Sequence, residues 1–177
     1  YNELKELFPD NAVHYFVSYY DYYQPEAYLP ATGMYIEKDF SVNEEIEKLR
    51  LAATHAIRTR KDVIIVATVS CIYGIGNPEV WTNVAISLEV GQQIKRSEIL
   101  EKLIKMNYER SAVEFKRGQV RVKGDIVDVF PAYLDTAIRI SLFGDEIESI
   151  HEIHSISNDI IKSMPNCRIF PATHFII

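Results

Sequence analysis

The chain has 177 residues, of which 47% are hydrophobic and 25% are charged. This composition is ordinary for a globular protein and excludes the disordered and collagen-like classes. The net charge of -6 argues against a protein that coats DNA in general, because neutralising phosphates takes clustered Lys and Arg. It does not exclude nucleic acid bound by stacking in a narrow groove.

The sequence indicates neither a membrane-spanning segment nor a disulfide. No apolar run approaches the ~18 to 20 residues that span a bilayer, and the first residues lack the basic and apolar regions of a signal peptide. We therefore expect a cytoplasmic protein without a membrane partner. Cys71 and Cys167 lie far apart without metal-ligand spacing, which favours core positions in a reducing compartment. His151 and His154 lack further ligands nearby, so a solvated surface is favoured over a metal site.

The first elements predicted are a helix end and a strand. Residues 1–7 have the pattern of an amphipathic helix that stops before Pro9, and no Met opens the chain, so we expect the sequence to begin inside a domain. Residues 12–18 then alternate as a short buried strand.

Residues 19–39 are the most unusual stretch, because six of the chain's eleven tyrosines fall inside them. Two prolines and a glycine near the middle are typical of a long β-hairpin with an irregular tip. Adjacent tyrosines point to opposite faces of a strand, so the four rings at 19, 20, 22 and 23 cannot all enter one core. Exposed rings stack on bases without regard to sequence, at roughly 1 to 3 kcal/mol per base, or act as a wedge beside distorted DNA. An aromatic core or a protein-binding patch is the alternative.

A β-α-β pattern follows the tyrosine-rich segment. Ser41 to Glu44 matches a helix capping box. Behind it, apolar residues recur at three- and four-residue steps and predict one buried helix face: Ile46, Leu49, Ala53, Ala56 and Ile57. The β-branched run at 63–67 predicts a strand buried on both faces of a parallel sheet. Strand, helix and strand in this order indicate an α/β layer.

The composition changes after residues 76–78. Ser97 is a candidate cap for a helix with the apolar face Ile99, Leu100, Leu103 and Ile104. Beyond it, short alternating strands are separated by the turn residues Gly118, Gly124, Gly144 and Asn158, a pattern that predicts an antiparallel sheet. We place a domain boundary near residue 84, with an α/β part at 1–83 and a small α+β part at 84–177.

Several strings in the chain resemble the UvrB family of bacterial excision-repair proteins. YYDYYQPEAY at 19–28, followed by IEKD at 36–39, is similar to the β-hairpin segment of that family. The likeness runs on through VSCIYG at 69–74, FKRG at 115–118, RVKGD at 121–125 and IFPA at 169–172, and so covers essentially the whole chain. The resemblance implies that the α/β part belongs to a helicase-like, P-loop-type parallel-sheet domain.

The resemblance also implies a function. It implies a damage-recognition subunit of nucleotide excision repair that takes damaged DNA from UvrA, passes one strand behind the hairpin and recruits UvrC. The residues that it assigns to DNA are Tyr22 and Tyr23 near the lesion, Tyr19 and Tyr20 at the hairpin base, Tyr28 and Tyr35 as a clamp, and Glu26 and Lys38 as the polar positions of the motif.

After residue 84 the chain resembles the UvrA-binding module, which transcription-repair coupling factor also has. The resemblance implies basic contacts to UvrA at four positions: Arg110, Arg121, Lys123 and Arg139. Arg121 and Lys123 are two residues apart on a strand and so point to one face. A basic pair suggests an acidic partner surface, although such a pair is more often only solvated. Ser141 stands where the resemblance leads us to expect an acidic residue.

The resemblance implies ATP and magnesium for the full-length family, held by a G-x-x-x-x-G-K-[ST] loop. That motif does not occur in this sequence, and Gly74 and Gly76 are interpreted as a turn before Pro78. The acidic stretch at 142–146 is interpreted as a hairpin turn rather than a magnesium site. Since the sequence also shows no nucleophile-base pair or metal cluster, we expect neither cofactor nor catalysis in this chain.

Two other functions stay open. In the first alternative, only the part after residue 84 functions, as a UvrA-binding interaction module like that of transcription-repair coupling factor. In that case we expect the tyrosine string to have no role. The chain could also be a stand-alone nucleic-acid-binding fold that uses tyrosine stacking, which predicts tight binding of single-stranded DNA by this chain itself.

Overall fold

The structure is a computed structural model that describes residues 1–18, 27–29, 34–36, 40–72, 83–111 and 114–173. It divides the chain into two compact units, Tyr1–Gly74 and Ile75–Ile177. This boundary lies some ten residues before the predicted position near 84.

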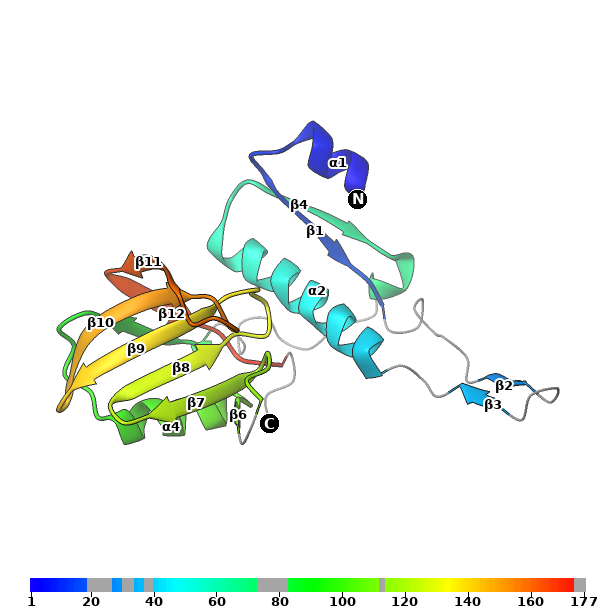
Figure 1. The fold of residues 1–177 in the computed structure, drawn as a ribbon. Helices are drawn as coiled ribbons and strands as arrows, with labels where there is room; N and C mark the ends of the chain where they lie inside the picture. Colours follow the sequence, from blue (N-terminus) through cyan, green and yellow to red (C-terminus); the bar gives the residue numbers. More distant parts are fainter. Residues whose placement is uncertain (19–26, 30–33, 37–39, 73–82, 112–113, 174–177) are drawn as a thin grey trace. The chain divides into compact units, whose positions relative to one another are not determined.

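The first unit is built on a β-α-β arrangement (Figure 1). Helix α1 (Asn2–Leu7) precedes strand β1 (Ala12–Phe16), and helix α2 (Phe40–Thr59) leads into strand β4 (Val63–Ala67) and the short 3-10 helix η1 (Val69–Ile72). β1 and β4 pair in parallel, from Ala12 opposite Val63 to Phe16 opposite Ala67. The predicted strand-helix-strand order with parallel strands is confirmed, whereas the P-loop-type assignment stays a prediction.

The ends and faces of these elements differ in detail from the sequence-based expectation. Helix α2 already begins at Phe40, so Ser41 lies inside the helix and is not its N-cap. Ile57, expected on the buried face, is exposed, whereas Arg50 and Leu51 are buried. Strand β4 is half-buried rather than buried on both faces, because among the described residues it pairs with β1 alone.

A short antiparallel ladder is described within the tyrosine-rich segment. Strands β2 (Ala27–Leu29) and β3 (Met34–Ile36) pair with Tyr28 opposite Tyr35. The predicted hairpin is confirmed at these six positions. The remainder of the segment, at 19–26, 30–33 and 37–39, lies outside the described residues.

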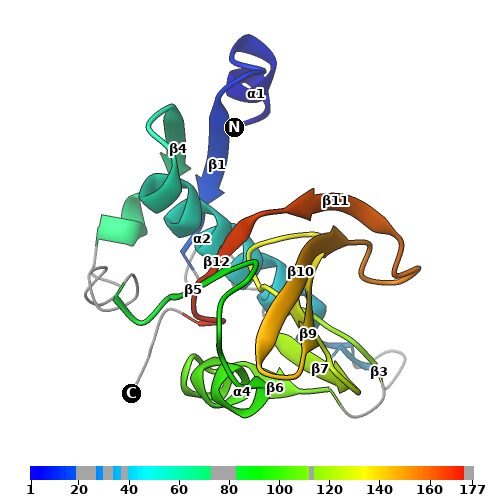
Figure 2. The same ribbon diagram turned by 90° about the vertical axis from the view of Figure 1, so that its left-hand side faces the viewer.

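The second unit contains a six-stranded sheet in the order β11-β10-β9-β8-β7-β6. Its strands are β6 (Glu109–Arg110), β7 (Gln119–Lys123), β8 (Ile126–Phe130), β9 (Ala137–Phe143), β10 (Glu146–Ile153) and β11 (Ile160–Met164). All neighbours are antiparallel except β6 and β7, which are parallel. β5 (Ile86–Glu89) and β12 (Asn166–Ile169) form a separate antiparallel pair (Figure 2). The predicted antiparallel sheet is confirmed.

The predicted turn residues are confirmed by their backbone angles. Gly118, Gly124, Gly144 and Asn158 all have positive φ, between 58° and 77°. Such angles suit glycine and are tolerated by asparagine. Gly144 and Asp145 form the turn between β9 and β10, as expected for a hairpin.

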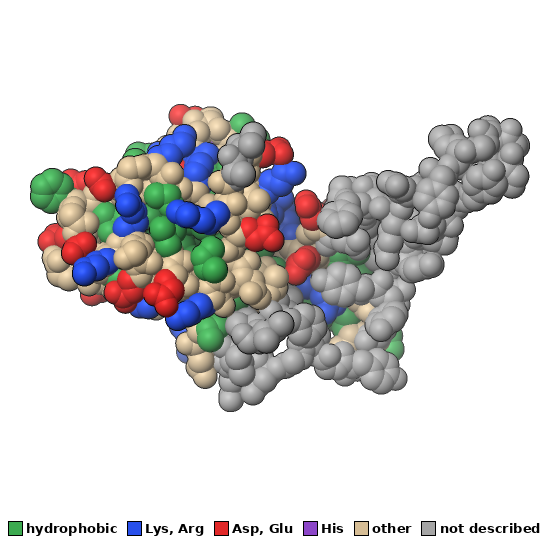
Figure 3. Space-filling model, turned by 90° about the horizontal axis from the view of Figure 1, so that it is seen from below, with side chains coloured by type: hydrophobic (Ala, Val, Ile, Leu, Met, Phe, Trp, Pro, Cys, Tyr) green, Lys and Arg blue, Asp and Glu red, His purple; other side chains and the backbone are tan. Residues whose placement is uncertain are grey.

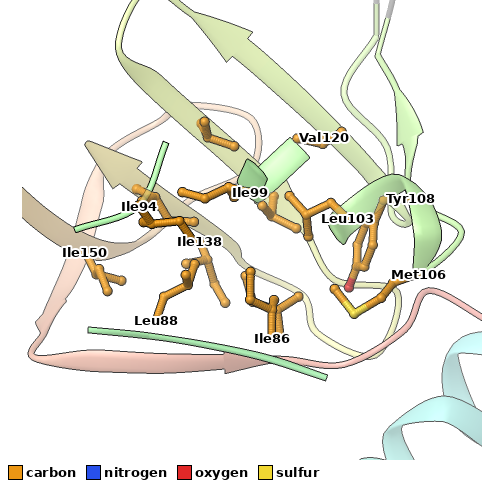
Figure 4. Close-up of a cluster of buried hydrophobic side chains, with 14 of the residues drawn as sticks. Ile86, Leu88, Ile94, Ile99, Leu103, Met106, Tyr108, Val120, Ile138 and Ile150 are labelled. Carbon is orange, nitrogen blue, oxygen red and sulfur yellow. The ribbon is translucent and has the colours of Figure 1, made fainter. Parts of the chain in front are cut away.

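One face of the six-stranded sheet packs under helix α4 (Arg96–Lys105). Ile99 and Leu103 of this helix are fully buried against sheet residues such as Val120 and Ile138 (Figure 4). The structure corrects two expectations. The helix begins at Arg96, with Lys95 at the N-cap position, so Ser97 is not its cap. Ile104 is exposed, so the apolar face is narrower than predicted.

Candidate partner-binding face

The sheet face away from α4, called the outer face below, carries a row of polar side chains. Successive residues of a strand point to opposite faces, and residues directly opposite each other on neighbouring strands share a face. Val120, Val127 and Ile140 belong to the core that packs against α4. The residues next to each of them along its own strand therefore face outward. The strand register then sets five polar residues side by side across β7 to β11: Arg121, Asp128, Arg139, His151 and Ser163.

Asp128 lies at the centre of two ion pairs in this row. Its side chain is 1% exposed, and Arg121 Nη2 donates to Oδ2 at 2.7 Å. Arg139 Nε donates to Oδ1 at 2.8 Å and Arg139 Nη2 to Oδ2 at 3.0 Å. Burial raises the pKa of Asp128, but the hydrogen bonds from Arg139 and Arg121 outweigh it, so the net pKa lies below its usual value. One buried carboxylate therefore holds two arginines in fixed positions.

Arg121 is fixed by two further contacts. Its Nη2 donates to Asn158 Oδ1 at 2.6 Å, and its Cζ lies 4.4 Å from the centre of the Phe115 ring. Its side chain is 19% exposed. Arg121 is thus held between a carboxylate, an amide and an aromatic ring, which lowers the entropy it would lose on meeting a partner.

A small apolar row runs beside the polar row on the outer face. Phe130, Ala137 and Ile153 are buried there together, with Phe115 packed on them. Arg117 Cζ lies 5.4 Å from the centre of the Phe130 ring, and the same guanidinium pairs with Asp135. The outer face therefore combines ordered cations with an apolar row that is buried at Phe130, Ala137 and Ile153.

The structure brings together some of the predicted docking residues and separates one. Arg121 and Arg139 meet at Asp128, and Lys123 is exposed two residues from Arg121 on the same face of β7. Arg110 on β6 lies opposite Val120, and so by register on the α4 side of the sheet. Ser141 lies opposite Ile126 on the outer face. The acidic group that we expected near Arg139 is supplied from the neighbouring strand instead, by Asp128.

Sequence reasoning missed Asp128, and it did not assign Phe115 or Asn158 to the site. One signal was present, since Asp128 is the only charged residue in the strand Ile126–Phe130. A charged residue inside such a buried strand requires a partner. Surface charge does not mark the site in the same way. On the face shown in Figure 3, Lys and Arg side chains are interspersed with Asp and Glu.

In the first unit, the residues just before the tyrosine-rich segment are tightly held. The buried Arg50 of α2 donates from Nη1 to the Val17 carbonyl at 2.7 Å, and its Cζ lies 4.6 Å from the centre of the Phe16 ring. The Ser18 N–H donates to Thr68 Oγ1 at 3.0 Å. Six of the predicted DNA-contacting residues lie outside the described residues: Tyr19, Tyr20, Tyr22, Tyr23, Glu26 and Lys38. Tyr28 and Tyr35 are placed only as backbone partners.

The cysteines lie at packed positions. Cys71 Sγ donates to the Phe16 carbonyl at 3.3 Å, and burial raises the pKa of Cys167 to about 12.

Within the described ranges, no three His, Cys, Asp or Glu side chains come together as a metal site. No helix among those residues is long and apolar enough to cross a membrane.

Comparisons with known proteins identify the family of the chain. A family model described as the UvrB interaction domain matches residues 86–175, which include the whole six-stranded sheet. The chain is 50% identical to UvrABC system protein B of Clavibacter michiganensis over 98% of its residues, 53% identical to that of Geobacillus kaustophilus over 99%, and 54% identical to that of Agathobacter rectalis over 100%. It covers 25%, 27% and 27% of these relatives, about a quarter of their length. The chain belongs to the UvrB family.

Proposed function

We propose that this chain serves nucleotide excision repair as part of a UvrB-type protein, with two tasks. The second unit docks on UvrA through the outer face of its sheet, and the tyrosine-rich segment of the first unit contacts damaged DNA. The docking task rests chiefly on one observation, the pair Arg121 and Arg139 fixed by the buried Asp128 inside the matched interaction domain.

The charges of the outer face favour an acidic partner surface. Two arginines and one aspartate leave a net positive charge, to which the exposed Lys123 adds. Arginines held in place by a carboxylate make directional hydrogen bonds to a second carboxylate with little loss of entropy. Complementary charge then sets both specificity and the rate of encounter.

Lys123 provides the sharpest test, because it is an exposed residue of the outer face. Lys123→Glu is expected to weaken binding of the chain to purified UvrA about tenfold or more in Kd, with the larger loss at low salt. Titration calorimetry at two salt concentrations measures this. Lys105→Glu on α4 makes the same charge change on the opposite side of the sheet and is expected to leave Kd within about twofold. Equal Kd values for the wild type and Lys123→Glu would remove the outer face as the docking surface.

The DNA task is supported by the tyrosine string together with the relatives, whose similarity extends over nearly the whole chain. In this proposal Tyr22 and Tyr23 stack beside the lesion, Tyr19, Tyr20, Tyr28 and Tyr35 support the strand passage, and Glu26 and Lys38 provide polar contacts. ATP with magnesium, and recruitment of UvrC, belong to the full-length protein. This chain alone contains no phosphate-binding loop motif, so we expect no ATP hydrolysis from it.

The alternative of a UvrA-binding module alone, as in transcription-repair coupling factor, has one observation in its favour. The family model matches only residues 86–175. Against it stands the identity of 50% or more to relatives over a range that includes the tyrosine-rich segment. DNA binding that is lost when the tyrosines are replaced would decide for the wider function.

A further inference from the structure

The turn between β10 and β11 displays the most exposed large apolar side chain among the described residues. Ile156 in this turn is 87% exposed, and Ile160, the first residue of β11, is 59% exposed. A single exposed isoleucine is common on protein surfaces. Together with Ile161, which is 50% exposed, they put three exposed isoleucines in the β10–β11 turn and the start of β11, an apolar patch that calls for a reason.

Ile160 continues the apolar row of the outer face. The β10–β11 register shifts between Glu152 and Ile153, and beyond this shift Ile160 lies opposite Ile153, which is buried with Phe130 and Ala137. The apolar row thus starts under Phe115, is buried through three strands and becomes exposed at Ile160. Ile160, the exposed end of this apolar row, lies on the same sheet face as Arg121 and Arg139. The apolar row runs next to the polar row that contains these two arginines.

The turn is ordered by its own hydrogen bonds and by Arg121. The His154 N–H donates to the Asp159 carbonyl at 2.9 Å, and the Asn158 N–H donates to the His154 carbonyl at 2.9 Å. Asn158 has a φ of 66°, and its Oδ1 accepts the 2.6 Å hydrogen bond from Arg121. The arginine of the docking face therefore also fixes the turn that carries Ile156. A turn that is already ordered loses less entropy when the side chain it carries meets a partner.

We propose that Ile156 and Ile160 form the apolar anchor of the docking face and enter an apolar depression on the same acidic partner surface that receives Arg121 and Lys123. This inference rests on the docking function proposed above, which assigns that surface to UvrA. It is favoured by the direct hydrogen bond between the basic row and the turn, and by the continuity of the buried apolar row with Ile160. Apolar anchors flanked by polar groups are the usual composition of an interface centre and its rim.

The test compares the exposed pair Ile156 and Ile160 with the single exposed residue Phe143 in the 177-residue chain. The double variant Ile156→Ser, Ile160→Ser is expected to weaken binding to purified UvrA about tenfold, to the same extent at low and high salt, because apolar contacts are not screened. Phe143→Ser is the matched control. Phe143 is 80% exposed but lies beside the β9–β10 turn, at the other end of β10. Its Kd is expected to stay within about twofold of the wild type. Thermal unfolding of every variant checks that the fold is retained, which exposed positions should permit.

The outcomes separate this inference from the function on which it rests. If Lys123→Glu weakens binding but the double isoleucine variant does not, docking stands and the apolar anchor is wrong. If Phe143→Ser weakens binding as much as the double variant does, a contact specific to the β10–β11 turn is contradicted. If Lys123→Glu leaves Kd unchanged, the outer face is not the docking surface, and the apolar anchor is wrong with it.

Discussion

Replacing Asp128 with alanine is expected to lower the free energy of unfolding of the second unit by about 3 kcal/mol. The carboxylate is buried and holds two arginines, so its loss leaves two positive charges together without a counter-ion. Removing one partner of a buried pair usually costs about 3 to 5 kcal/mol. We expect the lower end of this range, because the arginine side chains are 19% and 21% exposed and water can partly hydrate them. Urea unfolding followed by circular dichroism measures the loss.

The same variant is expected to lose affinity for UvrA, because Arg121 and Arg139 are no longer held in place. Asp145→Ala, in the exposed β9–β10 turn, removes one carboxylate from the same sheet and should change stability by less than about 0.5 kcal/mol. Unfolding midpoints of Asp128→Ala equal to those of the wild type would show that the two ion pairs do not stabilise the fold.

The contribution of Asp128 is also expected to depend on pH. Because its pKa in the folded chain is depressed below the ordinary 3.8, the ionised carboxylate adds stability above that ordinary value. This stability is lost as the pH falls through the lower, folded-state pKa. The difference in stability between the wild type and Asp128→Asn should therefore be constant from about pH 7 to about pH 5 and shrink below about pH 4. A difference that grows on acidification would contradict a depressed pKa.

Replacing Tyr22 and Tyr23 with alanine is expected to weaken the complex of the full-length protein with damaged DNA by about 1 to 3 kcal/mol for each stacked base. For the double variant this is roughly thirtyfold or more in Kd. The reason is that each ring provides a planar face for a base without a requirement for sequence. Fluorescence anisotropy with a labelled, damaged duplex, loaded by UvrA, measures the loss.

Two control variants distinguish stacking from folding in this experiment. Tyr22→Phe with Tyr23→Phe keeps both rings and should retain most of the affinity. Tyr1→Ala removes a ring outside the tyrosine-rich segment, one that stacks on Tyr15 with centroids 5.8 Å apart, and should leave DNA binding unchanged. Normal loading of the alanine double variant on damaged DNA would count decisively against the hairpin as the DNA-contacting element.

The fold could be predicted from the sequence wherever a local rule determines the structure. Positive φ at Gly124 and Gly144 follows from the backbone freedom of glycine, and alternation between such turns predicted the antiparallel strands. Helix caps were predicted less well. Ser41 and Ser97 are good capping residues, yet each helix begins one residue earlier, a difference of the size by which helix ends commonly vary.

The candidate site could be predicted only in part. The spacing of Arg121 and Lys123 placed both on one face of a strand, and the sheet agrees. The pairing of Arg121 with Asp128 and Asn158 depends on strand register and on a turn 37 residues further along the chain. Such long-range contacts leave no periodic signal in the sequence. Arg110 was grouped with Arg121, Lys123 and Arg139 for the same reason. The parallel β6–β7 register places it on the α4 side of the sheet instead.

We expect hydrogen exchange to slow when purified UvrA binds the chain, on the strands and turn of the outer face at residues 119–128, 137–141 and 154–163, with no change in α4 at 96–105. Protection concentrated on α4, or no protection anywhere in the second unit, would show that UvrA does not dock on the outer face.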